Sequence, residues 1–111
     1  MQNLKERAEY VVKSKNPFID QRGGIENYDL IFPVNMANII TSKAGSIRAN
    51  HYHPEQLQQV LIVSGSYVSV YKDLIDSNSE VKSHLVKAGD LVVTPPMIAH
   101  TMIFLEDCVL I

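Results

Sequence analysis

The 111-residue chain has one cysteine, no tryptophan and no apolar run long enough to cross a membrane. A transmembrane helix needs about 20 consecutive apolar residues, so none is expected. The single thiol, Cys108, cannot form an internal disulfide, and its apolar surroundings suit a small buried hydrophobe. The first residues, MQNLKERAEY, lack the apolar core of a signal peptide. Together these absences predict a cytoplasmic protein.

The sequence also has no marked excess of positive or negative charge. Lysine and arginine number 10 against 12 acidic residues, and the formal net charge is -2. Nucleic acids and anionic membranes attract proteins with a basic excess, so the sequence predicts neither as a partner. The length suits one domain. With no repeat, low-complexity stretch or linker, residues 1–111 are expected to form a single domain.

Short runs rich in valine, isoleucine, tyrosine and threonine fill most of the chain, and these residue types favour strands. The runs are Glu9–Lys13, Val34–Thr41, Ile47–His53, Gln58–Val63, Tyr67–Lys72, Val81–Val86, Leu91–Thr94, Thr101–Leu105 and Cys108–Ile111. All five glycines lie between runs, where tight turns need them. Many short strands at near-regular spacing predict an all-β sandwich or barrel. Only Leu4–Val12 has a helical spacing of apolar residues, and Tyr10–Val12 suits a strand equally well.

Three of the four histidines are candidates for a common site. His51 and His53 are two apart in an extended run, which places both on the same face of a strand. His100 follows a Pro-Pro turn, and Gln58 opens the strand that comes after His53. Imidazole, and more weakly an amide oxygen, can bind a divalent transition metal such as Zn, Fe, Ni or Mn. The fourth histidine, His84, has polar neighbours and is expected to face solvent.

The spacing of these residues follows two motifs. Residues 45–65 read G-x5-H-x-H-x4-Q-x6-G, and residues 89–100 read G-x5-P-x4-H. The pair resembles the two motifs of the cupin superfamily, with the second extending to about residue 104. The resemblance implies a single antiparallel, jelly-roll-like β-barrel with metal ligands at His51, His53, Gln58 and His100.

The chain departs from the usual cupin motifs at three positions. Gln58 stands in place of the glutamate, so the fourth ligand would be neutral. In the second motif, Met97 replaces the usual glycine and Phe104 the usual asparagine.

A narrower resemblance concerns enzymes that act on nucleotide sugars. The pattern R-x2-H-x-H-x4-Q over residues 48–58, followed by Ser-Gly-Ser at 64–66, is similar to the nucleotide-sugar 3,4-ketoisomerases. Asp-Gln-Arg-Gly at 20–23 resembles the D-x-R-G segment of the wider sugar epimerase and isomerase cupins. Those enzymes act on dTDP-4-keto-6-deoxy sugars without a metal. The resemblance implies that His51 and His53 shuttle protons. Ala99 and His100 differ from the tryptophan and arginine that these isomerases tend to have.

Histidine suits the chemistry of such an enzyme. Moving a carbonyl between adjacent carbons requires removal of a proton beside the carbonyl and return of one to the neighbouring carbon. The ordinary pKa of histidine, about 6.5, allows both steps near neutral pH. The intermediate is an enediolate, whose negative charge the Arg48 guanidinium can stabilise.

Three functions therefore remain open. The first is a metal-free nucleotide-sugar isomerase or epimerase of deoxysugar or polysaccharide biosynthesis, with His51, His53 and Arg48 as its catalytic residues. The second is a metal-dependent cupin, such as a dioxygenase or a phosphosugar isomerase-like protein, with one divalent ion on three histidines and Gln58. The third is a non-catalytic module that binds a sugar-type small molecule. The fold alone cannot decide, because one fold carries many activities.

The apolar run Cys108–Ile111 has no polar residue after it. Either the chain continues beyond Ile111 or this strand is protected in a dimer. Exposed edge strands pair readily with other chains, and two-fold dimers are the commonest assemblies, so a homodimer is expected.

Overall fold

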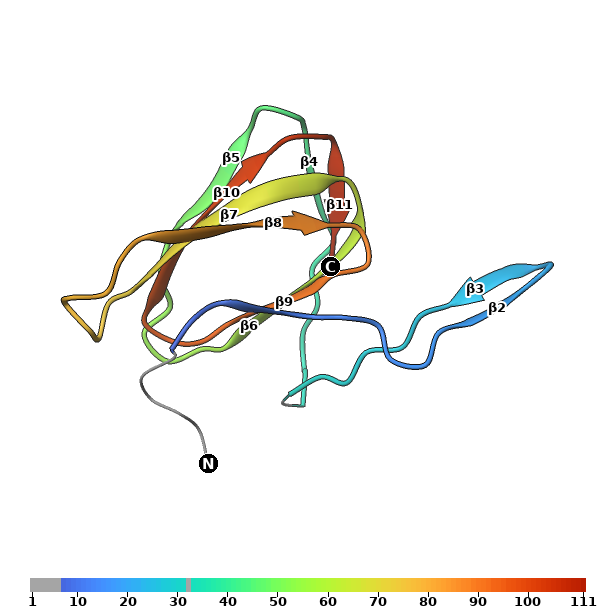
Figure 1. Cartoon of the computed structure of the whole chain (residues 1–111), viewed down its shortest axis with the longest axis horizontal. Coiled ribbons are helices and arrows are strands. Elements are labelled where there is room, and N and C mark those ends of the chain that lie inside the picture. Colours follow the sequence, from blue (N-terminus) through green and yellow to red (C-terminus); the bar gives the residue numbers. More distant parts are fainter. Residues whose placement is uncertain (1–6, 32) are drawn as a thin grey trace.

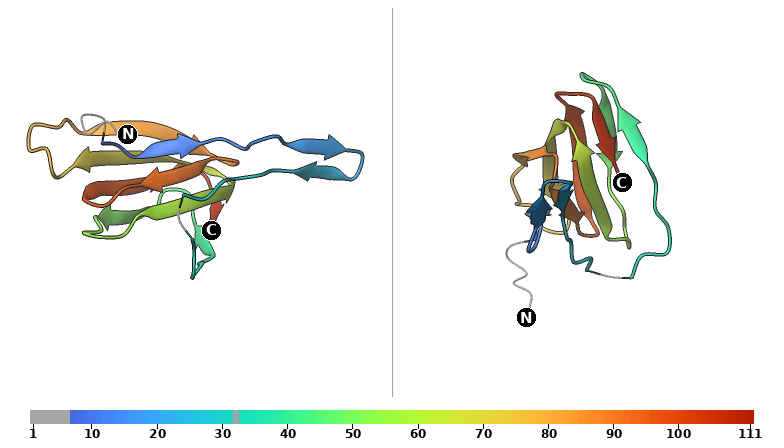
Figure 2. Two further views of the ribbon diagram at one scale, coloured as in Figure 1. Left: turned by 90° about the horizontal axis from the view of Figure 1, so that it is seen from below. Right: turned by 90° about the vertical axis from the view of Figure 1, so that its right-hand side faces the viewer.

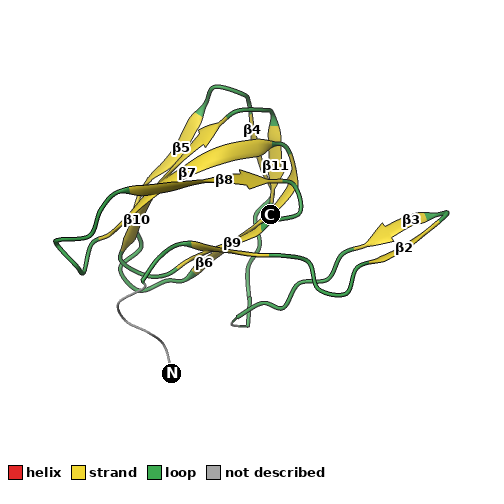
Figure 3. Cartoon of the chain, viewed as in Figure 1, coloured by secondary structure: helices red, strands yellow, loops and turns green. Residues whose placement is uncertain are grey.

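The computed structural model describes residues 7–31 and 33–111, which consist of strands and loops without a helix (Figure 3). All pairs of neighbouring strands are antiparallel. The all-β, antiparallel prediction is confirmed. The possible helix over Leu4–Val12 lies partly outside the described residues, and Tyr10–Val12 forms a strand. In the described part of the chain, no helix is long and apolar enough to span a membrane.

Two sheets face each other and form the body of the molecule (Figures 1 and 2). The first has five strands in the order β1 (Tyr10–Val12), β9 (Leu91–Thr94), β6 (Gln58–Ser64), β11 (Cys108–Leu110) and β4 (Ile40–Ser42). The second has four in the order β5 (Ile47–His51), β10 (Ile98–Phe104), β7 (Ser66–Asp73) and β8 (Lys82–Lys87). A hairpin of β2 (Phe18–Asp20) and β3 (Gly23–Ile25) projects away from both sheets (Figure 1).

Alternation along the longer strands creates the core. In β10 the buried residues are every second one, namely Ile98, His100, Met102 and Phe104. Successive side chains of a strand point to opposite faces, so this row points between the two sheets. The Phe104 ring packs against Tyr67 of β7, with ring centroids 5.3 Å apart. His100 is thus an imidazole within an otherwise apolar inward row.

Most predicted strands are present, with two differences. The strand predicted over Val34–Thr41 is wrong for its first part, since residues 34–39 form an exposed loop and β4 starts at Ile40. The β2–β3 hairpin was not predicted. Its two strands are only three residues long, too short to show an alternating pattern.

Both alternatives for the C-terminal run, continuation of the chain or protection in a dimer, assumed an exposed edge strand at Cys108–Ile111. β11 lies inside the five-stranded sheet, paired with β6 on one side and β4 on the other. Its ladder is therefore satisfied within the chain, and the argument from an unprotected edge does not apply. The homodimer itself stays a prediction.

Candidate functional site

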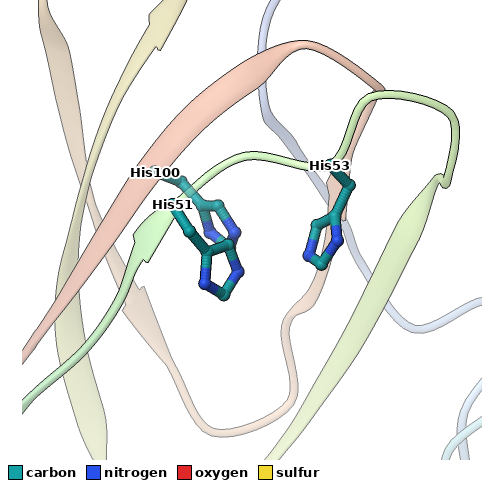
Figure 4. Close-up of side chains that lie close together, drawn as sticks. All are labelled: His51, His53 and His100. Atoms are coloured by element: carbon teal, nitrogen blue, oxygen red, sulfur yellow. The ribbon is translucent and has the colours of Figure 1, made fainter.

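Three histidines meet between the two sheets, as the motifs predicted. The ring centroids of His51 and His53 are 4.7 Å apart, and those of His51 and His100 are 5.0 Å apart. One nitrogen of each ring lies within 4.8 Å of the corresponding atoms of the other two. Figure 4 shows three imidazoles that face one common space. His51 lies at the end of β5, His53 on the loop after β5, and His100 on β10.

The route by which His51 and His53 meet differs from the prediction. They do not share one strand, because β5 ends at His51 and His53 lies in the loop beyond it. The pairing of β5 with β10 shifts between His100 and Thr101, and Ala49 and Asn50 have left-handed backbones with φ of 67° and 57°. A bulge of this kind bends a strand and redirects its side chains. The bulge places His51 opposite His100.

Met97 also has a left-handed backbone, with φ of 63°. This is the position where the cupin motif usually has glycine, the residue that adopts such a φ without steric cost. The Met97 amide donates a hydrogen bond to the carbonyl of His53 (2.8 Å), which fixes the loop that carries that histidine. The strained turn therefore supports the site directly.

Gln58 lies beside His53. Its side-chain oxygen is 3.1 Å from His53 Nε2. With the amide oxygen as acceptor, Nε2 carries the proton and Nδ1 has the free lone pair in the neutral ring, whereas the opposite tautomer requires the amide to present its NH₂ group instead. Gln58 therefore orients His53 in this structure.

His100 is the deepest of the three, at 3% exposure. Its Nδ1 lies 3.7 Å from a carboxylate oxygen of Glu9, and its Nε2 is buried without a hydrogen-bond partner in the described part of the chain. A buried polar nitrogen without a partner is uncommon in proteins. It marks a place where a ligand atom can bind.

The environment holds two of these imidazoles neutral. Partial desolvation, followed by the neighbouring His53, lowers the pKa of His51 below its ordinary value of 6.5, although this side chain is still exposed to solvent. Burial also lowers the pKa of His100, as do His51 and His53, although Glu9 opposes them. A neutral imidazole can accept a proton or bind a metal.

These lowered pKa values predict a stability that depends on pH. Between the lowered pKa values and 6.5, the unfolded chain binds more protons than the folded chain. The free energy of unfolding should therefore be highest above pH 6.5 and fall as the pH drops below it. Urea denaturation in a chelating buffer at about pH 7.5 and 5.5 measures the difference. His51→Asn should flatten this dependence, whereas equal stability of the unmodified protein at both pH values would contradict the prediction.

Arg48 lies near the site but is held by its neighbours. Its Nε donates to Ser42 Oγ (2.8 Å) and its Nη2 to the Thr41 carbonyl (3.0 Å). Both acceptors are neutral oxygens of β4. Arg48 and His51 line the same small, partly open cavity of about 220 Å³.

A larger cavity of about 1360 Å³ shares His51 and Gln58 with the smaller one, and its lining does not include His100 or Arg48. Its walls include residues from the segments 28–31 and 33–38, together with Pro95, His51, His53 and Gln58. Pockets for small molecules usually measure about 300–1000 Å³. This cavity therefore has room for a ligand of nucleotide-sugar size.

Two segments of the isomerase resemblance lie away from this cavity. Asp20–Gly23 form the turn of the projecting hairpin, where the Asp20 carboxylate accepts a hydrogen bond from Arg22 Nη2 (2.7 Å). Ser64–Ser66 form the turn at the opposite end of β6 from Gln58. In this chain neither segment reaches the three histidines.

The sequence analysis missed Glu9, which lies just before β1 and is 3% exposed. Burial alone would raise the pKa of this carboxyl, but hydrogen bonds from His84, Ser69 and Thr94 outweigh it and lower the pKa. His84 does not simply face solvent, because its Nε2 is 2.8 Å from Glu9 Oε1. No local pattern reveals these contacts, which join residues 60 to 85 positions apart.

Comparison with known proteins gives the following likenesses. No family model matches the sequence. A 65-residue stretch is 32% identical to Germin-like protein subfamily 3 member 2 of Arabidopsis thaliana. The match covers 59% of this chain and 27% of that protein, so the chain matches only about a quarter of its relative.

Solved structures resemble nearly the whole chain. A dTDP-4-dehydrorhamnose 3,5-epimerase from Sulfolobus tokodaii is 22% identical, with a TM-score of 0.75, over 98% of this chain and 70% of its own. The Mycobacterium tuberculosis epimerase is 22% identical, with a TM-score of 0.78, over 98% and 64%. A double mutant of the 3,4-ketoisomerase from Thermoanaerobacterium thermosaccharolyticum, in complex with TDP, is 24% identical, with a TM-score of 0.75, over 92% and 75%. At such identities the likeness establishes a shared fold.

Proposed function

The chain has the cupin fold of these sugar epimerases and ketoisomerases, and on that premise we propose that it is a nucleotide-sugar isomerase or epimerase acting through His51 and His53. The observation that carries the proposal is the position of the histidine cluster. His51 and His53 line a cavity of about 1360 Å³, and the lowered pKa keeps His51 neutral at pH 7. A general base must be unprotonated before it accepts a proton.

His51 acts as the base in this proposal. It removes the proton from the carbon next to the sugar carbonyl, and the electron pair moves onto the carbonyl oxygen to give an enediolate. Return of a proton to the former carbonyl carbon, with loss of the hydroxyl proton of its neighbour, moves the carbonyl by one position. Return to the original carbon from the opposite face gives epimerisation instead.

His53 is the second proton carrier. Gln58 is hydrogen-bonded to Nε2 of His53, so Nδ1 of this ring is available to the reacting atoms. The 4.7 Å between the ring centroids of His51 and His53 lets both act on one substrate. Arg48 lies three residues before His51 on the same strand. Its charge contributes to stabilising the enediolate, because its present partners are neutral oxygens.

Incubation with TDP-4-keto-6-deoxyglucose in deuterated buffer tests this function. The expected result is deuterium at the carbon beside the carbonyl, measured by mass spectrometry and proton NMR. A panel of further dTDP-4-keto-6-deoxy sugars covers other configurations. If none exchanges, the isomerase proposal fails. A metal-free protein that fails the assay would instead be a binding module.

A metal-dependent cupin is the second candidate, favoured by the three converging imidazoles and by His100 Nε2, which has no hydrogen-bond partner among residues 7–31 and 33–111. Zinc bonds to histidine nitrogen at about 2.0–2.1 Å, which places nitrogens about 3.4 Å apart in a tetrahedral site. The ligand nitrogens of the three rings lie within 4.8 Å of one another, and imidazole is a ligand that such ions prefer. The residues therefore fit a divalent ion. A bound ion would polarise a carbonyl oxygen as a Lewis acid.

We expect one divalent ion per chain under saturating conditions, held by imidazole nitrogens. Titration with Co²⁺, followed by its visible absorption and by calorimetry, measures the stoichiometry. His53→Ala should abolish binding, while Gln58→Ala should weaken it less because an amide is a poor ligand. Crystals soaked in metal whose three imidazoles contact only water would contradict this prediction.

A further inference from the structure

The buried Glu9 carboxylate lies behind the histidine cluster, between the two sheets. Its Oε1 accepts a hydrogen bond from Ser69 on β7 and lies 2.8 Å from Nε2 of His84 on β8. Its Oε2 accepts a hydrogen bond from Thr94 Oγ1 on β9 (2.7 Å). A buried carboxylate is costly unless such donors surround it. Glu9 is therefore fixed by three strands.

The Oε2 side of this carboxylate also faces His100. Oε2 is 3.7 Å from His100 Nδ1. This distance is about 0.5 Å longer than an ordinary hydrogen bond. A carboxylate only accepts hydrogen bonds, and a nitrogen lone pair pointing at it would be repelled. The nitrogen that faces Glu9 must therefore carry the proton. In a neutral ring the lone pair is then on Nε2, the atom without a partner.

We propose that Glu9 is a positioning residue, which holds His100 in the Nδ1–H tautomer and so leaves the Nε2 lone pair free for the ligand of the three-histidine site. This inference rests on the proposed function for the identity of that ligand, a sugar oxygen or a metal ion. The tautomer itself depends on neither. Partners of this kind fix the ring orientation of functional histidines, and their loss typically lowers activity or metal affinity about 10–100-fold.

A purely structural role for Glu9 is the competing explanation. The carboxylate connects the segment before β1 to β7, β8 and β9, so its loss would also lower stability. A stability measurement therefore cannot separate the two roles. The tautomer of His100 can, because it responds to the hydrogen-bonding character of the group that faces Nδ1, which a stability measurement does not report.

Long-range proton–nitrogen NMR on protein labelled with ¹⁵N-histidine reads the tautomer without substrate or metal. His100 is assigned through the signals lost in His100→Asn. The expected result is protonation of His100 at Nδ1 in the unmodified protein at pH 7.5 or so. Protonation at Nε2 would overturn the proposal without any variant of Glu9, whether or not the protein proves to be an isomerase.

Glu9→Gln keeps the shape of the side chain and can turn its amide donor toward Nδ1. We expect the Nε2–H tautomer to appear, with a fall of about 10–100-fold in deuterium exchange or in Co²⁺ affinity. Ser69→Ala is the matched control, because it removes a donor to the same carboxylate on the side away from His100. This control should keep the Nδ1–H tautomer. If Glu9→Gln keeps it too, Glu9 has only a structural role.

Discussion

Replacement of His51 by asparagine is expected to lower the rate of deuterium incorporation into a 4-keto sugar by about 10²–10⁴-fold, the usual contribution of general acid–base catalysis. Asparagine is polar and of similar size, but its amide does not accept a proton near neutral pH. The proton transfer that His51 provides occurs only in the transition state, so the loss should fall on kcat more than on binding. Quenched-flow mass spectrometry over a series of sugar concentrations separates the two.

Ile47→Asn serves as the matched control. It introduces the same side chain into the same strand, four residues earlier, at a position that is 63% exposed. Exchange by this variant should stay near that of the unmodified protein. Exchange by His51→Asn within about twofold of the control would remove His51 from the mechanism and leave His53 as the candidate base.

Replacement of Gly65 by alanine is expected to cost about 2–5 kcal/mol of unfolding free energy, the sum of a left-handed backbone and an overpacked core. Gly65 has φ of 91° in the turn between β6 and β7. An added Cβ would lie 2.3 Å from the Asp107 carbonyl oxygen and 2.5 Å from Cys108 Sγ. Real Cβ atoms do not approach so closely, so the C-terminal strand must move. Urea denaturation measures the loss.

Gly45→Ala separates the steric contribution from the backbone contribution. Gly45 also has a left-handed backbone, with φ of 86°, but nothing lies within 4 Å of an added Cβ. Its substitution should therefore cost only the conformational penalty, about 1–2 kcal/mol. Equal losses for the two variants would show that the contact with Asp107 and Cys108 relaxes without cost.

The two motifs predicted more about the fold and the histidine site than the amino-acid composition did. Runs of β-branched and aromatic residues separated by turn residues predicted an all-β fold, and the resemblance of the two motifs to cupins implied that it is antiparallel. The spacing of His51, His53 and His100 predicted their convergence, and the structure brings their rings within 6.2 Å of one another. These features are local to each strand, or follow from the order of strands in a known kind of barrel.

Tertiary structure decided what surrounds the histidines. Glu9 looks like an ordinary polar residue at the start of a strand, yet its partners come from three strands that follow it by 60 to 85 residues. The bulge at Ala49 and Asn50 arises from pairing with β10. No glycine at these positions indicates the bulge in the sequence. Long-range pairing with β6 also placed the C-terminal strand inside a sheet, whereas the D-x-R-G turn lies in a local hairpin that projects from the two sheets. The residue types at the site are therefore written in the sequence, whereas the hydrogen bonds that set their protonation depend on contacts between distant strands.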